Sequence, residues 1–288
     1  LWEEGLEEIE QKDGTKKLVY SGSKWGKYLR APDIYFKILE KGKDLFVPLK
    51  EVAEVRRGFT TGANEFFYLP SKHFDIYEDG EELVLIDKKT GEEKFRIERE
   101  FWMHKEKGKW IPNYVVKSPT ECKLYAVNND MLKHYVLLIN KSKSQLKGTS
   151  VLKYIQWGEK KEFHKRPTCA SRPRWYSLNP IPGQILCMMS LNDRYIFWIN
   201  MQDTYFDARL YGISLKDFDS EVIAGILNST LSYMFVELEG RVNLGQGALD
   251  VKVYEYKRIP IIHPCKIPAS IQLKIKNAFK KLSKRDSE

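Results

Sequence analysis

The chain has 288 residues, enough for one large domain or two ordinary ones with a sizeable buried core. A hydrophobic content of 42% and an aromatic content of 13% exclude a disordered protein. The formal net charge of +9 indicates an anionic partner, such as nucleic acid, an anionic membrane or an acidic protein. No apolar run approaches membrane-spanning length and the N-terminal segment is acidic, so we expect a cytoplasmic protein without a membrane partner.

The cysteines give no sign of a metal site. They lie far apart in the sequence, without a CxxC pair, at Cys122, Cys169, Cys187 and Cys265. A structural zinc site needs closely spaced cysteine and histidine ligands. We therefore predict no metal, and we expect reduced thiols, as in a cytosolic protein.

In chain order, the first predicted elements follow an acidic start. Residues 1–10 are rich in glutamate and predict a linker or a short surface helix, and residues 17–20 predict a strand. Pro32 interrupts the pattern that precedes it, and Asp33 is expected to cap a helix that runs through Leu39.

Two strand pairs are predicted next. Residues 49–56 predict a strand, residues 58–64 a polar turn and residues 66–69 a second strand, which together form either a β-hairpin or a strand-loop-strand unit. Residues 83–98 alternate apolar and polar side chains around an Asp-Lys-Lys-Thr-Gly turn, which predicts the second hairpin.

The rest of the chain mixes strands and helices. The apolar patterns predict strands at 135–139, 183–189, 195–199, 251–254 and 259–262, and helices at 151–157, 220–239 and 271–282. The order lacks the βαβαβ rhythm of a Rossmann-type domain. We therefore predict an α+β fold in which mixed β-sheets and hairpins pack against helices, with no Rossmann catalytic domain in this chain.

Motifs for several kinds of catalysis are missing. No Walker loop and no GxSxG elbow occurs in the sequence. Asp87, Glu92 and Lys94 only loosely resemble the carboxylates and lysine of a nuclease, and a charged turn explains them more simply. Residues 179–182, Asn-Pro-Ile-Pro, depart at their third and fourth positions from the Asn-Pro-Pro-aromatic motif with which amino-methyltransferases hold a flipped base.

A basic, glycine-containing segment at residues 56–64 is the strongest candidate for nucleic-acid contact. Arginine forks bind phosphates or guanine, threonine and asparagine bond phosphates or base edges, and glycine allows close backbone approach. The candidates for DNA binding are Arg56, Arg57, Thr60, Thr61 and Asn64, with Gly58 and Gly62 as close-approach glycines. The alternative is a hairpin whose strands happen to be basic.

Two further loops share this composition. The first contributes Arg172, Arg174, Trp175 and Tyr176, whose rings are candidates for stacking on an unpaired base; the alternative is arginines that buttress a core tryptophan. The second contributes Arg241, Asn243 and Gln246, with close-approach glycines Gly245 and Gly247; the alternative is an ordinary helix end at Gly240.

Several segments resemble one family of proteins. The sequence is similar to the C-terminal target-recognition (specificity) domain of restriction-modification N6-adenine DNA methyltransferases, and it also resembles the specificity subunits of type I restriction enzymes. The resemblance lies in residues 25–32, 55–69, 226–229, 240–241, 245–247 and 257–261.

The resemblance implies a division of the chain and a set of partners. Residues 1–30 would be a linker or the end of an upstream catalytic domain, residues 31–265 the DNA target-recognition domain, and residues 266–288 a basic C-terminal helix. The partners would be double-stranded DNA and an upstream catalytic methyltransferase domain or subunit that carries S-adenosylmethionine. This chain would hold no cofactor and would be non-catalytic alone, because the catalytic Asn-Pro-Pro-aromatic motif and the methyl-donor glycine motif are missing.

Two other functional classes remain open from the sequence. One is a self-contained nucleic-acid enzyme, either a nuclease or a methyltransferase. The other is a protein-docking module that holds a catalytic partner through the acidic start or the basic terminal helix.

Overall fold

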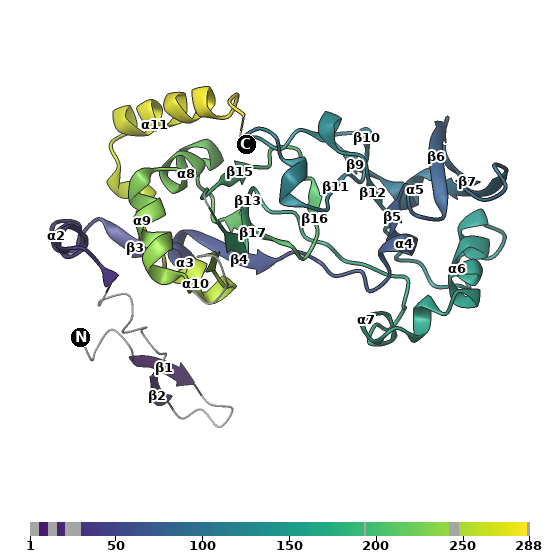
Figure 1. The fold of residues 1–288 in the computed structure, drawn as a ribbon, viewed down its shortest axis with the longest axis horizontal. Helices are drawn as coiled ribbons and strands as arrows, with labels where there is room; N and C mark the ends of the chain where they lie inside the picture. Colours follow the sequence, from purple (N-terminus) through teal and green to yellow (C-terminus); the bar gives the residue numbers. More distant parts are fainter. Residues whose placement is uncertain (1–5, 11–15, 21–29, 193, 242–247, 287–288) are drawn as a thin grey trace.

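The computed structural model describes residues 6–10, 16–20, 30–192, 194–241 and 248–286 (Figure 1). Within these residues the buried apolar side chains form two large clusters and a smaller one. The first core draws on residues from both ends of the described chain, whereas the second draws on residues 63–178. The second core is therefore built from a segment that leaves the first core and later returns to it.

The first core surrounds a four-stranded antiparallel sheet in the order β15-β13-β17-β4. The strands are β15 (Phe197–Ile199), β13 (Ile185–Met188), β17 (Leu210–Leu215) and β4 (Ala53–Arg57). The helices that contribute to this core are α2 (Asp33–Lys41), α3 (Leu49–Val52), α8 (Ser220–Leu227), α9 (Thr230–Glu239), α10 (Val253–Arg258) and α11 (Ala269–Leu282). In Figure 1, α11 lies over α8 and brings Phe279 into the core.

Short strand pairs accompany the sheet of the first core. They are β3 (Phe46–Pro48) with β19 (Pro260–Ile262), and β14 (Ser190–Leu191) with β18 (Leu249–Asp250). β1 (Leu6–Glu10) and β2 (Lys16–Tyr20) form a separate antiparallel pair near the start of the chain.

Single 3₁₀ turns occur at Pro119–Glu121, Asn129–Met131, Phe163–Lys165 and Pro264–Lys266.

The second core packs helices against a three-stranded antiparallel sheet. The sheet consists of β6 (Phe74–Asp79), β7 (Glu82–Asp87) and β8 (Glu93–Glu98). The helices are α4 (Asn64–Phe67), α5 (Arg99–Trp102), α6 (Ser150–Lys160) and α7 (Pro167–Ala170). Its short strand pairs are β5 (Tyr68–Leu69) with β12 (Tyr135–Val136), and β9 (Met103–Glu106) with β10 (Lys109–Pro112).

Aromatic rings hold the second core together. Tyr154 of α6 stacks on Phe66 of α4 at a centroid distance of 4.7 Å, and Phe74 and Phe95 of the sheet pack on the same tyrosine. The Tyr154 hydroxyl donates to the Phe66 carbonyl oxygen at 2.8 Å. Because these rings come from α4, α6, β6 and β8, their burial fixes the two helices against the sheet.

The smaller cluster lies where the two cores meet. β11 (Val115–Val116) pairs in parallel with β16 (Tyr205–Phe206), and buried Phe206, Trp198 and Leu186 pack in this cluster. Backbone hydrogen bonds therefore join β11, which lies in the segment that builds the second core, to β16, the strand before β17.

The α+β prediction is confirmed, and so are several elements. The helices predicted at 151–157 and 271–282, the hairpin at 83–98 and the strand at 259–262 all form. The helix through Leu39 also forms, although Asp33 is its first residue and makes no side-chain cap. Residues 6–10 form a strand, so of the two alternatives for residues 1–10, a linker or a surface helix, the helix is wrong.

The hairpin expected at 49–69 does not form, whereas strands do stand on both sides of the loop, as β4 and β5. Residues 49–52 form a short helix, and β4 pairs with β17 while β5 pairs with β12. The segment between β4 and β5 therefore crosses from the first core to the second. The alternation of apolar and polar residues within 49–69 could not predict these pairings, because the partner strands β17 and β12 lie far away in the sequence.

The predicted long helix at 220–239 is two helices. The Asn228 side-chain amide donates to the carbonyl oxygens of Ala224 and Phe197, each at 2.8 Å, and Ser229 then caps α9 by accepting from the Ser232 backbone N–H. Residues 253–258 are helical where a strand was predicted at 251–254, because Glu255 caps the turn by accepting from the Lys252 backbone N–H at 2.7 Å.

Candidate nucleic-acid interface

Two arginines of opposite orientation, Arg56 and Arg57, stand where β4 leads into segment 57–64, which crosses between the cores. Successive side chains of a strand point to opposite faces, so Arg57 shares a face with buried Val55, while Arg56 lies beside Glu54. Arg56 Nη2 donates to Glu54 Oε2 at 2.7 Å, whereas Arg57 Nε donates to the Ala208 carbonyl oxygen at 2.9 Å. The hydrogen bond and charge of Glu54 raise the pKa of Arg56. The two arginines therefore cannot act on the same surface.

The glycines of this segment approach the chain's own backbone. A Cβ atom on Gly58 would lie 2.2 Å from the Asp207 carbonyl oxygen. Gly62 has φ of +75°, a left-handed value that favours glycine, and it packs against Thr168 and Cys169 of α7. Close approach is thus required at both positions, and in this structure it serves internal packing.

Thr60 and Asn64 are exposed, whereas Thr61 is buried. The Thr61 hydroxyl donates to Asn64 Oδ1 and accepts from the Ala63 backbone N–H at 3.2 Å. Thr61 therefore orients Asn64 at the start of α4, and the Asn64 amide group stays on the surface.

The Arg172 loop combines structural and exposed residues. Arg172 donates to the carbonyl oxygens of Thr60 at 2.5 Å and Trp175 at 3.2 Å, which ties this loop to the crossing segment. Trp175 and Tyr176 are buried in the second core, where Trp175 Nε1 donates to Glu159 and the Tyr176 hydroxyl to the Lys141 carbonyl oxygen. This placement agrees with the core-tryptophan alternative and leaves neither ring open to a base.

Arg174 is the exposed cation of this loop. Among the residues that the structure describes, its guanidinium has no hydrogen-bond or ion-pair partner. A pocket of about 340 Å³ lies beside it, lined by Phe59, Thr60, Arg172, Pro173, Arg174, Ser177, Leu178 and Asn179. The crossing segment and the Arg172 loop thus form one surface.

Arg241 is held by a buried carboxylate. Its Nε donates to Glu255 Oε1 at 2.8 Å, and Glu255 is 1% exposed. Its guanidinium also lies over the Tyr254 ring. Breaking a buried ion pair is costly, so Arg241 acts here as a structural residue. The other candidates of this loop, Asn243, Gly245, Gln246 and Gly247, lie outside the described residues.

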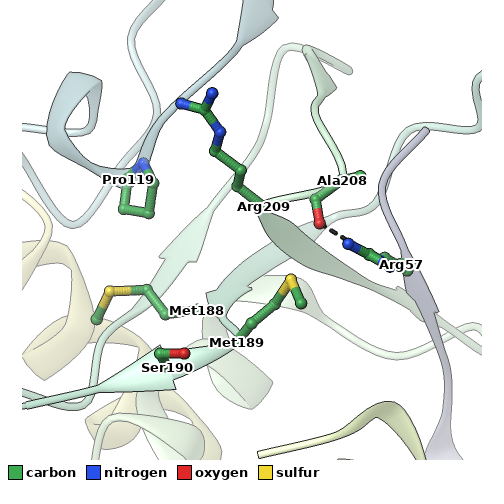
Figure 2. Close-up of a pocket in the computed structure, with 7 residues that line it drawn as sticks. All are labelled: Arg57, Pro119, Met188, Met189, Ser190, Ala208 and Arg209. Atoms are coloured by element: carbon green, nitrogen blue, oxygen red, sulfur yellow. Dashed lines mark hydrogen bonds between the residues drawn. The ribbon is translucent and has the colours of Figure 1, made fainter. Parts of the chain in front are cut away.

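Figure 2 shows a second pocket, of about 290 Å³, at the start of the crossing segment. Its lining residues are Arg57, Pro119, Met188, Met189, Ser190, Ala208 and Arg209. Arg209 has a side chain that is 61% exposed, and its Nε lies 3.8 Å from Asp207 Oδ1. Arg209 stands alone in the turn before β17 and belongs to no motif, so the sequence does not indicate it.

A third pocket, of about 220 Å³, lies at the far end of the segment and is lined by Asn64, Glu65, Tyr68, Pro70, Ser71, Lys72 and Lys117. Arg166 donates to both Glu65 oxygens, at 2.8 and 3.0 Å, and lowers the pKa of that carboxyl to about 2. Burial lowers the pKa of Lys117, whose Nζ lies 3.1 Å from His134 Nε2. The sequence had not indicated either lysine.

No candidate metal or membrane-spanning site emerges from the described ranges. They contain no group of three or more His, Cys, Asp or Glu side chains that could hold a metal ion. None of their helices combines the length and apolarity needed to cross a membrane.

Comparison with known proteins identifies a family and several similar solved structures. The family model described as "Type II methyltransferase M.Eco57I, C-terminal domain" matches residues 115–287. The structure of the type IIG restriction endonuclease BpuSI superimposes with a TM-score of 0.55 at 11% sequence identity. The alignment covers 88% of this chain and 28% of that chain, so this chain spans less than a third of that enzyme. No curated protein sequence matches.

Proposed function

This chain belongs to the family of the type II methyltransferase M.Eco57I C-terminal domain, and on that premise we propose that it recognises double-stranded DNA for a restriction-modification enzyme. The observation that carries the proposal is the surface at segment 57–64, where two pockets meet exposed arginines between the two cores. Exposed guanidiniums bind phosphates and guanine edges, and amides read adenine edges.

The proposed contact residues are a subset of the exposed side chains on this surface. They are Arg57, Thr60, Asn64, Arg174 and Arg209. Thr61 and Arg172 support the surface from within, since their polar groups are bonded to other parts of the chain. Arg241 is left out because its guanidinium is bound to buried Glu255. Arg56 is paired with Glu54 on the other face of β4.

The proposal extends to the chemistry that this surface serves. The recognition domain would position an adenine for N6 methylation by an upstream catalytic domain or subunit. S-adenosylmethionine would bind in that catalytic part, and this chain would be non-catalytic alone. The resemblance of residues 55–69 and 226–229 to adenine-specific recognition domains supports this assignment.

The direct test is salt-titrated binding of the 288-residue chain to duplex DNA. Each lysine or arginine that neutralises a phosphate contributes about 0.9 to the slope of log K against log salt. We expect Arg174→Ala to weaken binding to every duplex and to reduce the slope by about one. We expect Asn64→Ala to cost ~1–3 kcal/mol at one position of a preferred sequence while leaving the slope unchanged.

Arg56→Ala is the matched control, because it also removes one exposed arginine, and Arg56 is paired with Glu54 on the other face of β4. Equal losses for Arg56→Ala and Arg174→Ala would indicate a general effect of net charge. Affinity that does not change with salt would end the proposal. Binding of S-adenosylmethionine by the chain alone, measured calorimetrically, would instead favour a self-contained methyltransferase.

A further inference from the structure

We propose that the β9–β10 hairpin, which carries Lys105, Lys107 and Lys109, is a second contact for the phosphate backbone of duplex DNA. The inference rests on the proposed function and adds a surface outside segment 57–64 and its pockets. In Figure 1 the hairpin lies beside β11, which belongs to the joint between the two cores.

The tip of the hairpin is a two-residue turn whose first residue is a lysine. Lys109 pairs with Glu106, so Lys107 and Gly108 alone make the turn. Their φ angles are +45° and +83°, and positive φ at both positions is the mark of a type I′ turn. Asparagine, aspartate and glycine are favoured at the first position, because most other side chains are strained there. The chain thus keeps a strained lysine where a neutral asparagine would fit better.

The three lysines spread positive charge over the tip and both faces of the hairpin. Directly paired residues share a face, and successive residues of a strand point to opposite faces. Lys105 therefore lies on the face of Trp110, and Lys109 lies on the other face with Glu106. All three lysines are exposed, and within the described part of the chain none of them has a hydrogen-bond, ion-pair or cation–π partner. Three lysines and one glutamate give residues 105–109 a net charge of +2.

The base of the hairpin is fixed to the joint between the cores. His104 Nδ1 lies 2.9 Å from Asn113 Oδ1, and the imidazole packs edge-on against the Tyr205 ring at a centroid distance of 5.9 Å. The Asn113 backbone N–H donates to the Trp102 carbonyl oxygen at 2.8 Å, which closes the base. Tyr205 begins β16, and the chain continues from there to Arg209 of the pocket in Figure 2. The hairpin is therefore anchored next to the surface proposed to bind DNA.

The hairpin offers charges more than a stacking surface. The Arg99 guanidinium lies over the Trp110 ring at 4.5 Å from its centroid, and Arg99 also pairs with Glu81 at 2.6 Å. One face of the ring is thus already covered. Lysine ammonium groups bind phosphates as point charges and carry no sequence information. A protein partner is a poorer match, because protein–protein interfaces are depleted in lysine.

The β7–β8 hairpin provides a comparison within the same chain. Its lysines have acidic partners, since Lys88 pairs with Asp75 at 3.1 Å and Lys94 pairs with Asp87. Lys89 is exposed at the turn, and it is not among the residues with positive φ. Carboxylates thus offset the charge of this turn, and we expect it to stay clear of DNA. Lys89 is therefore the matched control for Lys107.

The first experiment compares salt slopes for binding to a mixed-sequence duplex. We expect Lys107→Asn to weaken binding at low salt and to reduce the slope by about one. The same variant should raise the melting temperature of the protein by about 2 °C, because asparagine tolerates positive φ. Lys107→Arg should keep the slope, since the charge remains. Lys89→Asn should leave the slope unchanged.

A second experiment locates the contact directly. The chain is acetylated with an N-hydroxysuccinimide ester, free and saturated with the duplex, and the modification of each lysine is read by mass spectrometry. We expect DNA to protect Lys105, Lys107 and Lys109 and to leave Lys89 as reactive as before. Equal modification of the hairpin lysines in the free and the bound chain would overturn the proposal, even if the salt slope had changed.

The outcomes separate this inference from the proposed function. If Arg174→Ala reduces the slope while Lys107→Asn does not, the hairpin contact is wrong and DNA recognition stands. If the unaltered chain shows no salt-dependent DNA binding, both fail. Poly-glutamate tests the other class of partner. If poly-glutamate protects the hairpin lysines and duplex DNA does not, the hairpin binds an acidic protein surface and the proposal is overturned.

Discussion

The Tyr68 hydroxyl donates to Asp207 Oδ2 at 2.7 Å, which joins two residues that are 139 positions apart in the sequence. Tyr68 belongs to the second core, and Asp207 lies between β16 and β17 beside the first. Both residues are buried, and burial together with the Asp207 charge raises the pKa of Tyr68, so the phenol remains a donor. This bond thus links the two cores directly behind the crossing segment.

Tyr68→Phe is expected to destabilise the chain by about 1–3 kcal/mol, because the Asp207 carboxylate loses its strongest partner while still buried. Urea unfolding measures the change. Tyr77→Phe is the control, since Tyr77 is 47% exposed. Equal stability of the two variants would show that the bond between the cores contributes nothing.

Acid stability should depend on Glu65. Arg166 holds the pKa of this carboxyl at about 2, below its ordinary value of 4.5. A depressed folded-state pKa stabilises the fold above the unfolded value and loses that contribution as pH falls from about 4.5 toward about 2. Glu65→Gln should therefore lower stability near neutral pH by about 1–2 kcal/mol and flatten the loss below about pH 4.

Unfolding by urea at several pH values measures this dependence. Glu40→Gln provides the comparison, as Glu40 is an exposed carboxylate on α2. If Glu65→Gln kept the full acid sensitivity of the unaltered chain, the ion pair with Arg166 would not be its source.

Asn228 should contribute more to stability than Ser229, although both stand at the break between α8 and α9. The Asn228 side chain makes three hydrogen bonds to backbone groups. Its oxygen accepts from the Phe197 N–H, and its amide nitrogen donates to the carbonyl oxygens of Phe197 and Ala224. Asn228→Ala is expected to cost about 2–4 kcal/mol. Ser229→Ala removes a helix cap and should cost about 1 kcal/mol. Thermal unfolding would rank the two; the reverse order would contradict the structure.

Gly58→Ala should be far more disruptive than Gly91→Ala. At Gly58 a methyl group would lie 2.2 Å from a backbone oxygen, so the crossing segment must shift. At Gly91 the surrounding space is open, and the strain comes from φ of +73°, which costs about 1 kcal/mol. The expected losses are about 3 kcal/mol or more and about 1 kcal/mol, measured by chemical unfolding.

The sequence predicted elements whose signals are local. The helix at 151–157 and the hairpin at 83–98 depend on near neighbours, and both formed as expected. The predicted hairpin at 49–69 failed because β4 finds its partner in β17, which lies far along the chain. The helix break at Asn228 was missed for the same reason, since Phe197 supplies part of the bonding.

The sequence predicted which segments form the candidate site, but not which of their side chains are exposed on it. Residues 56–64 and 172–176 do meet, through the bond from Arg172 to Thr60. The exposure of each arginine depends on its partners in the fold, and the sequence does not show these partners. Arg241, for example, is bound by Glu255. Arg209 and Lys117 carry no local pattern, so only their position in the fold indicates them.

The close packing around Gly212 has a consequence for how this chain can change. Arg56 pairs with Gly212 across β4 and β17, and a Cβ atom on Gly183 would lie 2.9 Å from Gly212 Cα. Residues 58–182 therefore leave the sheet after β4 and return to it before β13, close to the same residue, Gly212. A segment whose ends are already held together costs little more as it lengthens, about 0.6 kcal/mol for each doubling. A change of length at an exposed turn inside the segment, such as the turn at Gly91, should thus leave the register of β4 against β17 unchanged.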